Sequence, residues 1–162
     1  MEKKFVLPEE TISLYQEALA FYRKGEYADA LFKVRALSGI DYGWLQRQLL
    51  HSYILKAMGD TYSEITVLQS LLRSADKMKL TVDDESLVAE ALSLLGSACR
   101  RLGCTRKAIS AFLESAAKEK SREAKAVELS NAFFTANAEA GFSVKEWGGL
   151  YQRYNQLFQG IR

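Results

Sequence analysis

The sequence predicts an all-α protein, and three observations support this class. The only proline is Pro8, so about 150 residues follow without a helix breaker. The dipeptides Asn-Gly and Asp-Gly, which mark β-hairpin turns, are absent, and no segment alternates between polar and apolar residues for more than a few positions. With 48% hydrophobic and 26% charged residues, the 162-residue chain has a globular composition and can bury a core.

Two helical hairpins are expected in the first half of the chain, with turns at Gly25 and Gly59. On both sides of each glycine, apolar or small residues recur at steps of three and four, which indicates an apolar stripe on each helix. Around Gly25 these residues are Leu14, Ala18, Phe21, Tyr27, Ala30 and Val34, and around Gly59 they are Ser52, Leu55, Tyr62, Ile65 and Leu68.

A third hairpin is the best defined, and it contains two glycines with different roles. Gly96 lies inside an apolar stripe, where the lack of a side chain would let a neighbouring helix backbone approach closely. Gly103 ends that stripe just after two arginines, as expected for a left-handed residue that terminates a helix. The stripe residues are Leu92, Leu95, Gly96, Cys99 and Leu102 on the first helix and Ala108, Ile109, Phe112 and Ala116 on the second.

The three hairpins recur at a regular spacing. Gly25 and Gly59 are 34 positions apart, while Gly59 and Gly103 are 44 apart, and the polar residues 76–86 absorb the excess as a loop or a longer helix end. A single hairpin cannot bury its own stripe, so a recurring one predicts a stacked array. This 34-residue step, with small residues at fixed places and a glycine at the turn, resembles the tetratricopeptide repeat (TPR).

The resemblance implies a right-handed solenoid of helical hairpins, with about three repeats followed by C-terminal capping helices. We expect the repeats at residues 11–44, 45–82 and 89–122. The second copy is degenerate, with Ile65 near the small-residue position and one extra residue in its turn. Residues 123–162 would cap the array or link it to a catalytic domain outside this chain.

The C-terminal part is expected to hold two helices, one over residues 122–140 and one after Gly141, where Ser143 and Glu146 have the spacing of a capping box. One interpretation is a cap, in which Phe133, Phe134, Trp147 and Tyr151 cover the last repeat. Residues 129–158 also resemble the segment before the catalytic part in bacterial O-linked N-acetylglucosamine transferases and SPINDLY-type relatives. The matching residues are Ser130, Asn131, Phe133, Phe134, Asn137, Ser143, Tyr151, Arg153 and Tyr154.

Several functional classes are disfavoured by the composition. A net charge of +2 is too small to imply nucleic acid or a membrane surface, although residues 100–125 hold eight Lys/Arg against three Glu. The first ten residues lack the apolar core of a signal peptide, and no apolar run approaches the length of a membrane span. Cys99 and Cys104 are expected to be reduced thiols. We therefore expect a cytoplasmic protein that binds neither nucleic acid nor membrane.

No catalytic or metal-binding motif is present. His51 is the only histidine, and phosphate loops, HExxH and nucleophile elbows are missing. The acids Asp83, Asp84 and Glu85 are expected to serve a helix N-terminus. We assign no catalysis, cofactor or metal to this chain, whatever the activity of a longer parent.

A peptide-binding groove is the predicted functional site, because the first helix of each hairpin lines the inner face of a TPR stack. Tyrosines would supply contact area, while guanidinium and amide groups would bond to an extended peptide, acidic ones included. An alternative is that Tyr15 and Tyr53 are partly core. The groove residues are Tyr15, Tyr22, Arg23, Gln46, Tyr53, Lys56, Ser93, Ser97, Arg100, Arg101 and Asn131.

The leading functional hypothesis is a protein- or peptide-binding domain that recruits substrates or partners, as the N-terminal part of a protein O-glycosyltransferase. Two alternatives are a stand-alone TPR adaptor and a self-association module that forms a homodimer.

Overall fold

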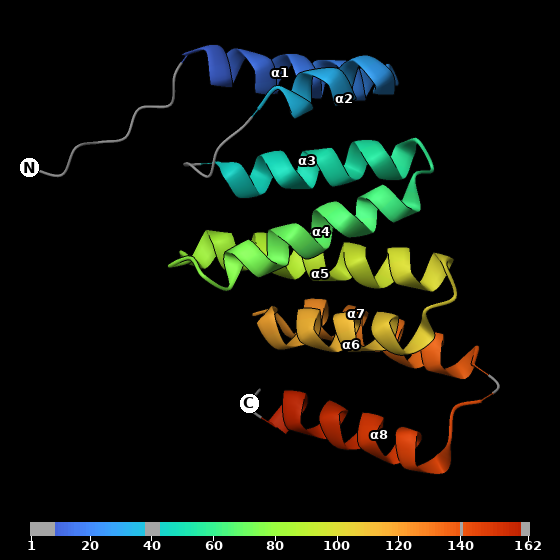
Figure 1. Ribbon diagram of the computed structural model, residues 1–162. Coiled ribbons are helices and arrows are strands. Elements are labelled where there is room, and N and C mark those ends of the chain that lie inside the picture. Colours follow the sequence, from blue (N-terminus) through green and yellow to red (C-terminus); the bar gives the residue numbers. More distant parts are fainter. Residues whose placement is uncertain (1–8, 38–42, 140, 160–162) are drawn as a thin grey trace, which may run out of the picture. The chain divides into compact units, whose positions relative to one another are not determined.

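The computed structural model describes residues 9–37, 43–139 and 141–159, and every regular element in these ranges is an α-helix (Figure 1). The chain divides into two compact units, one ending at Leu71 and the other starting at Leu72. The helices are α1 (Glu9–Lys24), α2 (Tyr27–Arg35), α3 (Trp44–Ala57), α4 (Thr61–Ala75), α5 (Val82–Arg101), α6 (Thr105–Lys118), α7 (Arg122–Asn137) and α8 (Val144–Gln159). The predicted all-α class is therefore confirmed.

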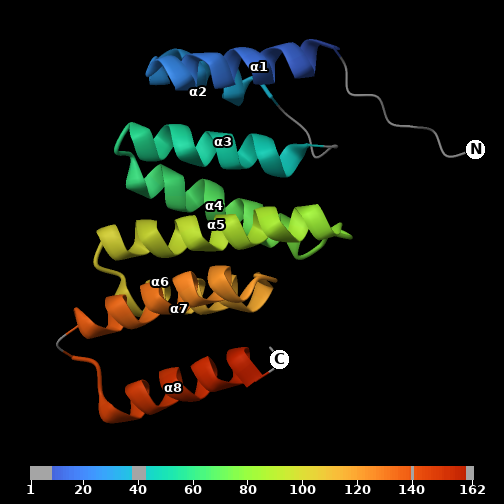
Figure 2. The same ribbon diagram turned by 180° about the vertical axis from the view of Figure 1, so that it is seen from behind.

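The first unit is built on the α1–α2 hairpin, with α3 packed against α2 (Figures 1 and 2). Ala18 and Ala30 are fully buried, as expected for small residues where two helices approach closely. The partly buried rings of Tyr15, Phe21 and Tyr22 pack against this core. The buried cluster consists of Ala18, Ala30, Leu31, Val34, Leu50, Ile54 and Leu55.

The second unit contains the α5–α6 hairpin, followed by α7 packed along α6 and then α8 (Figure 2). The fully buried Phe112 of α6 lies against Gly96 of α5, where a Cβ atom would be only 2.8 Å from the ring. The atoms nearest to Gly96 thus belong to an aromatic ring, whereas we expected the backbone of the neighbouring helix there. Ala108 is fully buried on α6, as predicted.

The turns of the three hairpins have the same hydrogen-bond pattern. At Gly103, whose φ is +75°, the Cys104 N–H donates to the Cys99 carbonyl at 2.9 Å and the Gly103 N–H donates to the Arg100 carbonyl at 3.0 Å. This pairing is a Schellman motif, which requires a left-handed residue at its C′ position. Gly25 and Gly59 have the same two bonds with their equivalent neighbours. The predicted terminating role of the turn glycines is confirmed.

The second hairpin has no extra residue in its turn, contrary to our expectation. In each hairpin the second helix begins two residues after the turn glycine, at Tyr27, Thr61 and Thr105. The fifth residue after the glycine is therefore Ala30, Ala108 and, in the second hairpin, Glu64 rather than Ile65. Glu64 is fully buried, as are the two alanines. An acid in a small-residue position made the second copy look shifted.

The excess spacing before the third hairpin comes from longer helices, and the connection at residues 76–81 adds none of it. The helix α4 has 15 residues against nine in α2. The helix α5 has 20 residues against 14 in α3, and it begins at Val82, well before the expected repeat boundary at Ala89. Asp84 takes part in a capping box with Thr81, in which the Asp84 N–H donates to Thr81 Oγ1 at 3.2 Å. The predicted N-terminal role of the acidic run is therefore confirmed for Asp84.

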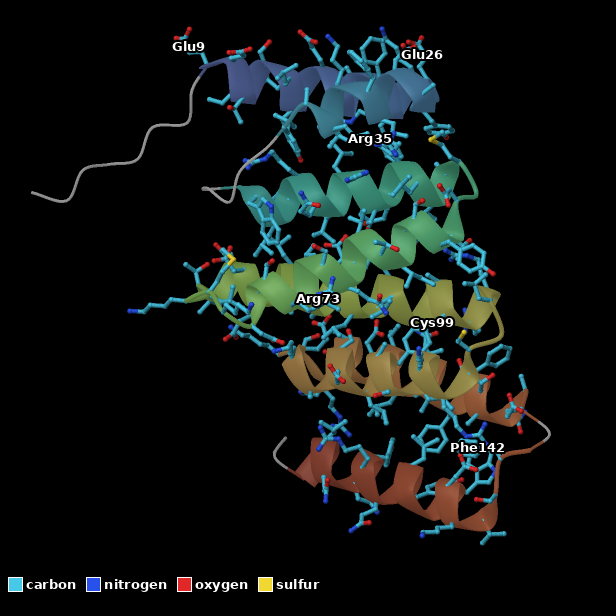
Figure 3. The ribbon with its side chains drawn as sticks, in the orientation of Figure 1. Glu9, Glu26, Arg35, Arg73, Cys99 and Phe142 are labelled. Carbon is cyan, nitrogen blue, oxygen red and sulfur yellow. The ribbon has the colours of Figure 1, made fainter. Side chains whose placement is uncertain are left out.

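An aromatic cluster joins α7 to α8. The Phe133 ring lies 6.2 Å from Trp147, 5.2 Å from Tyr151 and 5.7 Å from Tyr154, as distances between ring centroids. Phe142, labelled in Figure 3, adds an edge contact to Trp147 at 5.1 Å. Phe134 was expected in this cap but is 68% exposed and contacts α5 instead.

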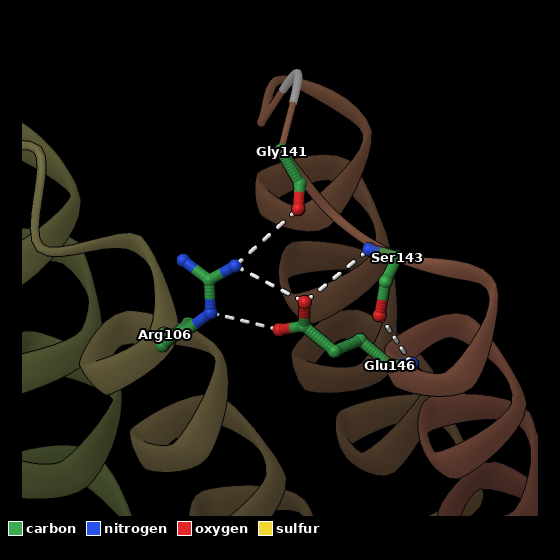
Figure 4. Close-up of polar contacts among 4 residues, drawn as sticks. All are labelled: Arg106, Gly141, Ser143 and Glu146. Carbon is green, nitrogen blue, oxygen red and sulfur yellow. Dashed lines mark hydrogen bonds and ion pairs between the residues drawn. The ribbon is translucent and has the colours of Figure 1, made fainter.

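A polar contact ties the start of α8 to α6 (Figure 4). Arg106 Nε donates to Glu146 Oε2 at 2.8 Å, and a second guanidinium nitrogen donates to Glu146 Oε1 at 3.1 Å. Glu146 also completes the predicted capping box, accepting from the Ser143 N–H at 3.2 Å. The hydrogen bonds from Arg106, followed by the bond from the Ser143 N–H and then the charge of Arg106, lower the pKa of Glu146 to about 2.

Candidate functional site

Polar side chains from α5 and α7 form one surface within the second unit, here called the α5–α7 face. Steps of three and four residues place side chains on the same side of a helix. The Ser93 hydroxyl donates to Glu128 Oε1 at 3.0 Å, and the Arg100 guanidinium carbon lies 6.0 Å from the Phe134 ring centroid. These contacts link side chains of the two helices, both of which pack against α6. The face consists of Ser93, Ser97 and Arg100 on α5 and Glu128, Asn131 and Phe134 on α7.

Arg100 is exposed, yet its guanidinium group has two aromatic neighbours. Its carbon lies 5.7 Å from the ring centroid of the buried Phe112, in addition to the contact with Phe134. A guanidinium within about 6 Å of a ring face is attracted by the π electrons. This attraction restricts the Arg100 side chain while its N–H groups stay available for a carboxylate.

Glu128 is a buried acid in the middle of this face, with only 8% of its surface exposed. Oε1 accepts a hydrogen bond from Ser93, and the carboxyl is also hydrogen-bonded to the Asn131 side chain. Among the described residues, none donates a hydrogen bond to Oε2. Burial raises the pKa of Glu128 and nearby Glu119 raises it further, whereas the bonds from Ser93 and Asn131 act in the opposite direction.

The site residues predicted in the second unit lie largely together. Ser93, Ser97 and Asn131 are half-exposed, and Arg100 and Arg101 are exposed. Glu128 and the position of Phe134 were not predicted from the sequence. A signal for Glu128 was present, because it precedes Ala132 by four positions and Ala136 by eight, which places it in the apolar stripe of α7.

The site residues predicted in the first unit divide into two kinds. Tyr15 and Tyr22 are half-buried and pack against the core cluster, and Tyr22 also pairs with Tyr27 at 5.9 Å. These two tyrosines therefore contribute to packing, as the alternative interpretation held for Tyr15. Tyr53 is half-buried as well, whereas Arg23, Gln46 and Lys56 are exposed.

The remaining candidates for chemistry are His51, Cys99 and Cys104. In the part of the chain that the structure describes, no group of three or more His, Cys, Asp or Glu side chains could hold a metal ion. His51 is half-buried, and burial followed by the charge of Arg35 lowers its pKa. Cys99 is buried and Cys104 exposed, and neither forms a disulfide. Of the described helices, none is both long enough and apolar enough to cross a membrane.

The repeated hairpins, with their glycine turns and small buried residues, define a helical-repeat fold of the tetratricopeptide type. A solved structure of this type, the TPR2AB-domain:pHSP90 complex of yeast Sti1, matches with a TM-score of 0.66 at 12% sequence identity. The match covers 93% of this chain and 64% of that chain, so this chain spans about two thirds of the length of that Sti1 structure. This structural match confirms the predicted fold class.

A second solved structure, the MamA RS-1 ArsTM double mutant, is 14% identical and has a TM-score of 0.39. That match covers 96% of this chain and 98% of the other. No family model and no curated protein matches this sequence.

Proposed function

We propose that this chain is a protein-binding TPR-type domain whose α5–α7 face binds an extended segment of a partner protein. The observation that carries the proposal is Arg100, a cation positioned by two aromatic rings beside half-exposed Ser97 and Asn131. The fold supports it as well, because the similar Sti1 structure is a TPR2AB-domain:pHSP90 complex.

The chemistry of the face favours a partner segment with at least one carboxylate. Arg100 presents a planar array of N–H donors that can bind a carboxylate in bidentate fashion. The exposed ring of Phe134 offers apolar contact area next to it. Ser97 and the Asn131 amide can bond to the peptide backbone between side chains.

Titration of a glutamate-containing peptide into wild-type and Arg100→Gln proteins tests this proposal. We expect the substitution to weaken binding at least tenfold at low salt, or about 1.4 kcal/mol, with a smaller difference at high salt because exposed charges are screened. Arg153→Gln is the matched control, since Arg153 is exposed on α8 and the change in net charge is the same. Equal affinities of wild type and Arg100→Gln would rule out this face as the carboxylate-binding site.

A narrower hypothesis is that the domain recruits substrates for a protein O-glycosyltransferase. Its support is the resemblance of residues 129–158 to the segment that precedes the catalytic part of such enzymes. A glycosyltransferase domain encoded downstream in the same gene would support it, and a natural stop after Arg162 would favour the stand-alone adaptor. Sedimentation that depends on protein concentration would favour the self-association module. A cytoplasmic location remains a prediction from the sequence.

A further inference from the structure

Two charged positions of opposite sign lie on the α5–α7 face at a defined separation. Arg100 and Ser93, the partner of Glu128, are seven residues apart on α5. At about 1.5 Å per residue this corresponds to about 10 Å along the helix axis. A peptide in the polyproline II conformation advances about 3.1 Å per residue with three residues per turn, so side chains three positions apart project from the same side and span about 9 Å.

The Glu128 position lacks positive charge. Its Oε1 accepts from the uncharged Ser93 hydroxyl, and among the described residues no side chain, charged or neutral, donates a hydrogen bond to Oε2. A buried carboxylate without a cationic partner is unfavourable in the free protein. Its field acts through the half-exposed Ser93 and Asn131 side chains, because charge interactions near the protein interior are screened far less than in water.

We propose that the α5–α7 face recognises a bipolar segment, which carries an acidic side chain and, three positions away, a Lys or Arg side chain. The acidic side chain binds Arg100. The basic side chain binds over Ser93 and Asn131, opposite Glu128. This inference rests on the proposed peptide-binding function and specifies the partner. A purely acidic segment would place a second carboxylate near Glu128, and like charges at an interface oppose binding. The charge of the face therefore favours a mixed Glu/Lys sequence over a run of acids.

Blocked peptides with Glu and Lys three positions apart, in either order, provide the test. The matched peptides carry norleucine in place of Lys, which keeps the aliphatic chain and removes the charge. For the wild-type protein at low salt, we expect norleucine to weaken binding at least tenfold in the preferred order. The affinities of Glu128→Gln for the Lys and norleucine peptides should differ by less than twofold. Glu128→Asp should still bind the Lys peptide more tightly than the norleucine peptide.

The outcomes separate this inference from the proposed function. Equal binding of the Lys and norleucine peptides to wild type, with a loss of affinity in Arg100→Gln, would overturn the bipolar segment and leave peptide binding at Arg100 intact. Binding of neither peptide at millimolar concentration would overturn both. Because the comparison of peptides needs only the wild-type protein, it remains decisive if a Glu128 variant fails to fold.

Discussion

Replacing Gly96 by alanine should destabilise the fold, although alanine is the better helix former. A Cβ atom at Gly96 would lie 2.8, 2.8 and 2.9 Å from three carbons of the Phe112 ring. Carbon atoms in contact prefer about 3.5–4.0 Å, so the ring would have to move by about 0.7 Å. Phe112 is fully buried, and Arg100 lies over its ring, so this movement disturbs several neighbours.

The expected magnitude follows from two opposing terms. Overpacking a core costs about 1–3 kcal/mol, and the approach of three ring atoms places Gly96→Ala near the upper end. The gain in helix propensity offsets about 1 kcal/mol of this cost. We expect a net loss of about 2 kcal/mol, or a fall in Tm of about 4–8 °C for a chain of this length, measured by thermal unfolding.

Gly148→Ala is the matched control, because it makes the same change within α8 where no atom lies within 4 Å of the added carbon. It should raise the unfolding free energy by up to about 1 kcal/mol. In a Phe112→Leu background, Gly96→Ala should cost at least about 1 kcal/mol less than in wild type if the ring is the obstacle. Equal stabilisation by the two glycine substitutions would refute the packing argument.

Three other substitutions test the packing and the charges of the second unit. Ala108→Leu should lower stability by about 1–3 kcal/mol, because Ala108 is fully buried, and an unchanged Tm would contradict this. Arg106→Gln should lower the Tm at neutral pH but not near pH 2. The pKa of Glu146 is lower in the folded than in the unfolded protein, so its ion pair stabilises the fold above the unfolded-state pKa, and this stability is lost as the carboxylate is protonated in acid. Glu128→Gln should raise the Tm at pH 7 and change it less at pH 4. The raised pKa of Glu128 means that the folded state is more stable with this carboxyl protonated, so stability falls as the pH rises through that pKa. Equal changes in Tm at the two pH values would contradict the raised pKa.

Helical periodicity and glycine placement predicted much of the fold. Gly25, Gly59 and Gly103 were identifiable because a left-handed helix end strongly favours glycine, whatever surrounds it. The register of the second hairpin was not identifiable in the same way. Glu64 occupies a fully buried position that hydrophobic patterning assigns to a small apolar residue, and patterning does not predict a carboxyl there.

The candidate site was predicted less completely than the fold, for a related reason. Spacing placed Arg100 and Asn131 on inner faces, but it could not show which residues of another helix they contact. Phe133 and Phe134 are adjacent aromatic residues, yet one packs with α8 and the other faces Arg100. Successive residues on a helix point about 100° apart, so the assignment depends on the orientation of α7, which follows from tertiary packing.

The glycine turns constrain how this chain can change in length during evolution. One residue separates each turn glycine from the next helix, so an insertion there would rotate that helix by about 100° and turn its apolar stripe away from its partner. The extra residues that distinguish the second glycine spacing from the first lie in the longer helices α4 and α5, on the side where one hairpin connects to the next. Related sequences should therefore keep a constant length at the glycine turns and vary where one hairpin connects to the next.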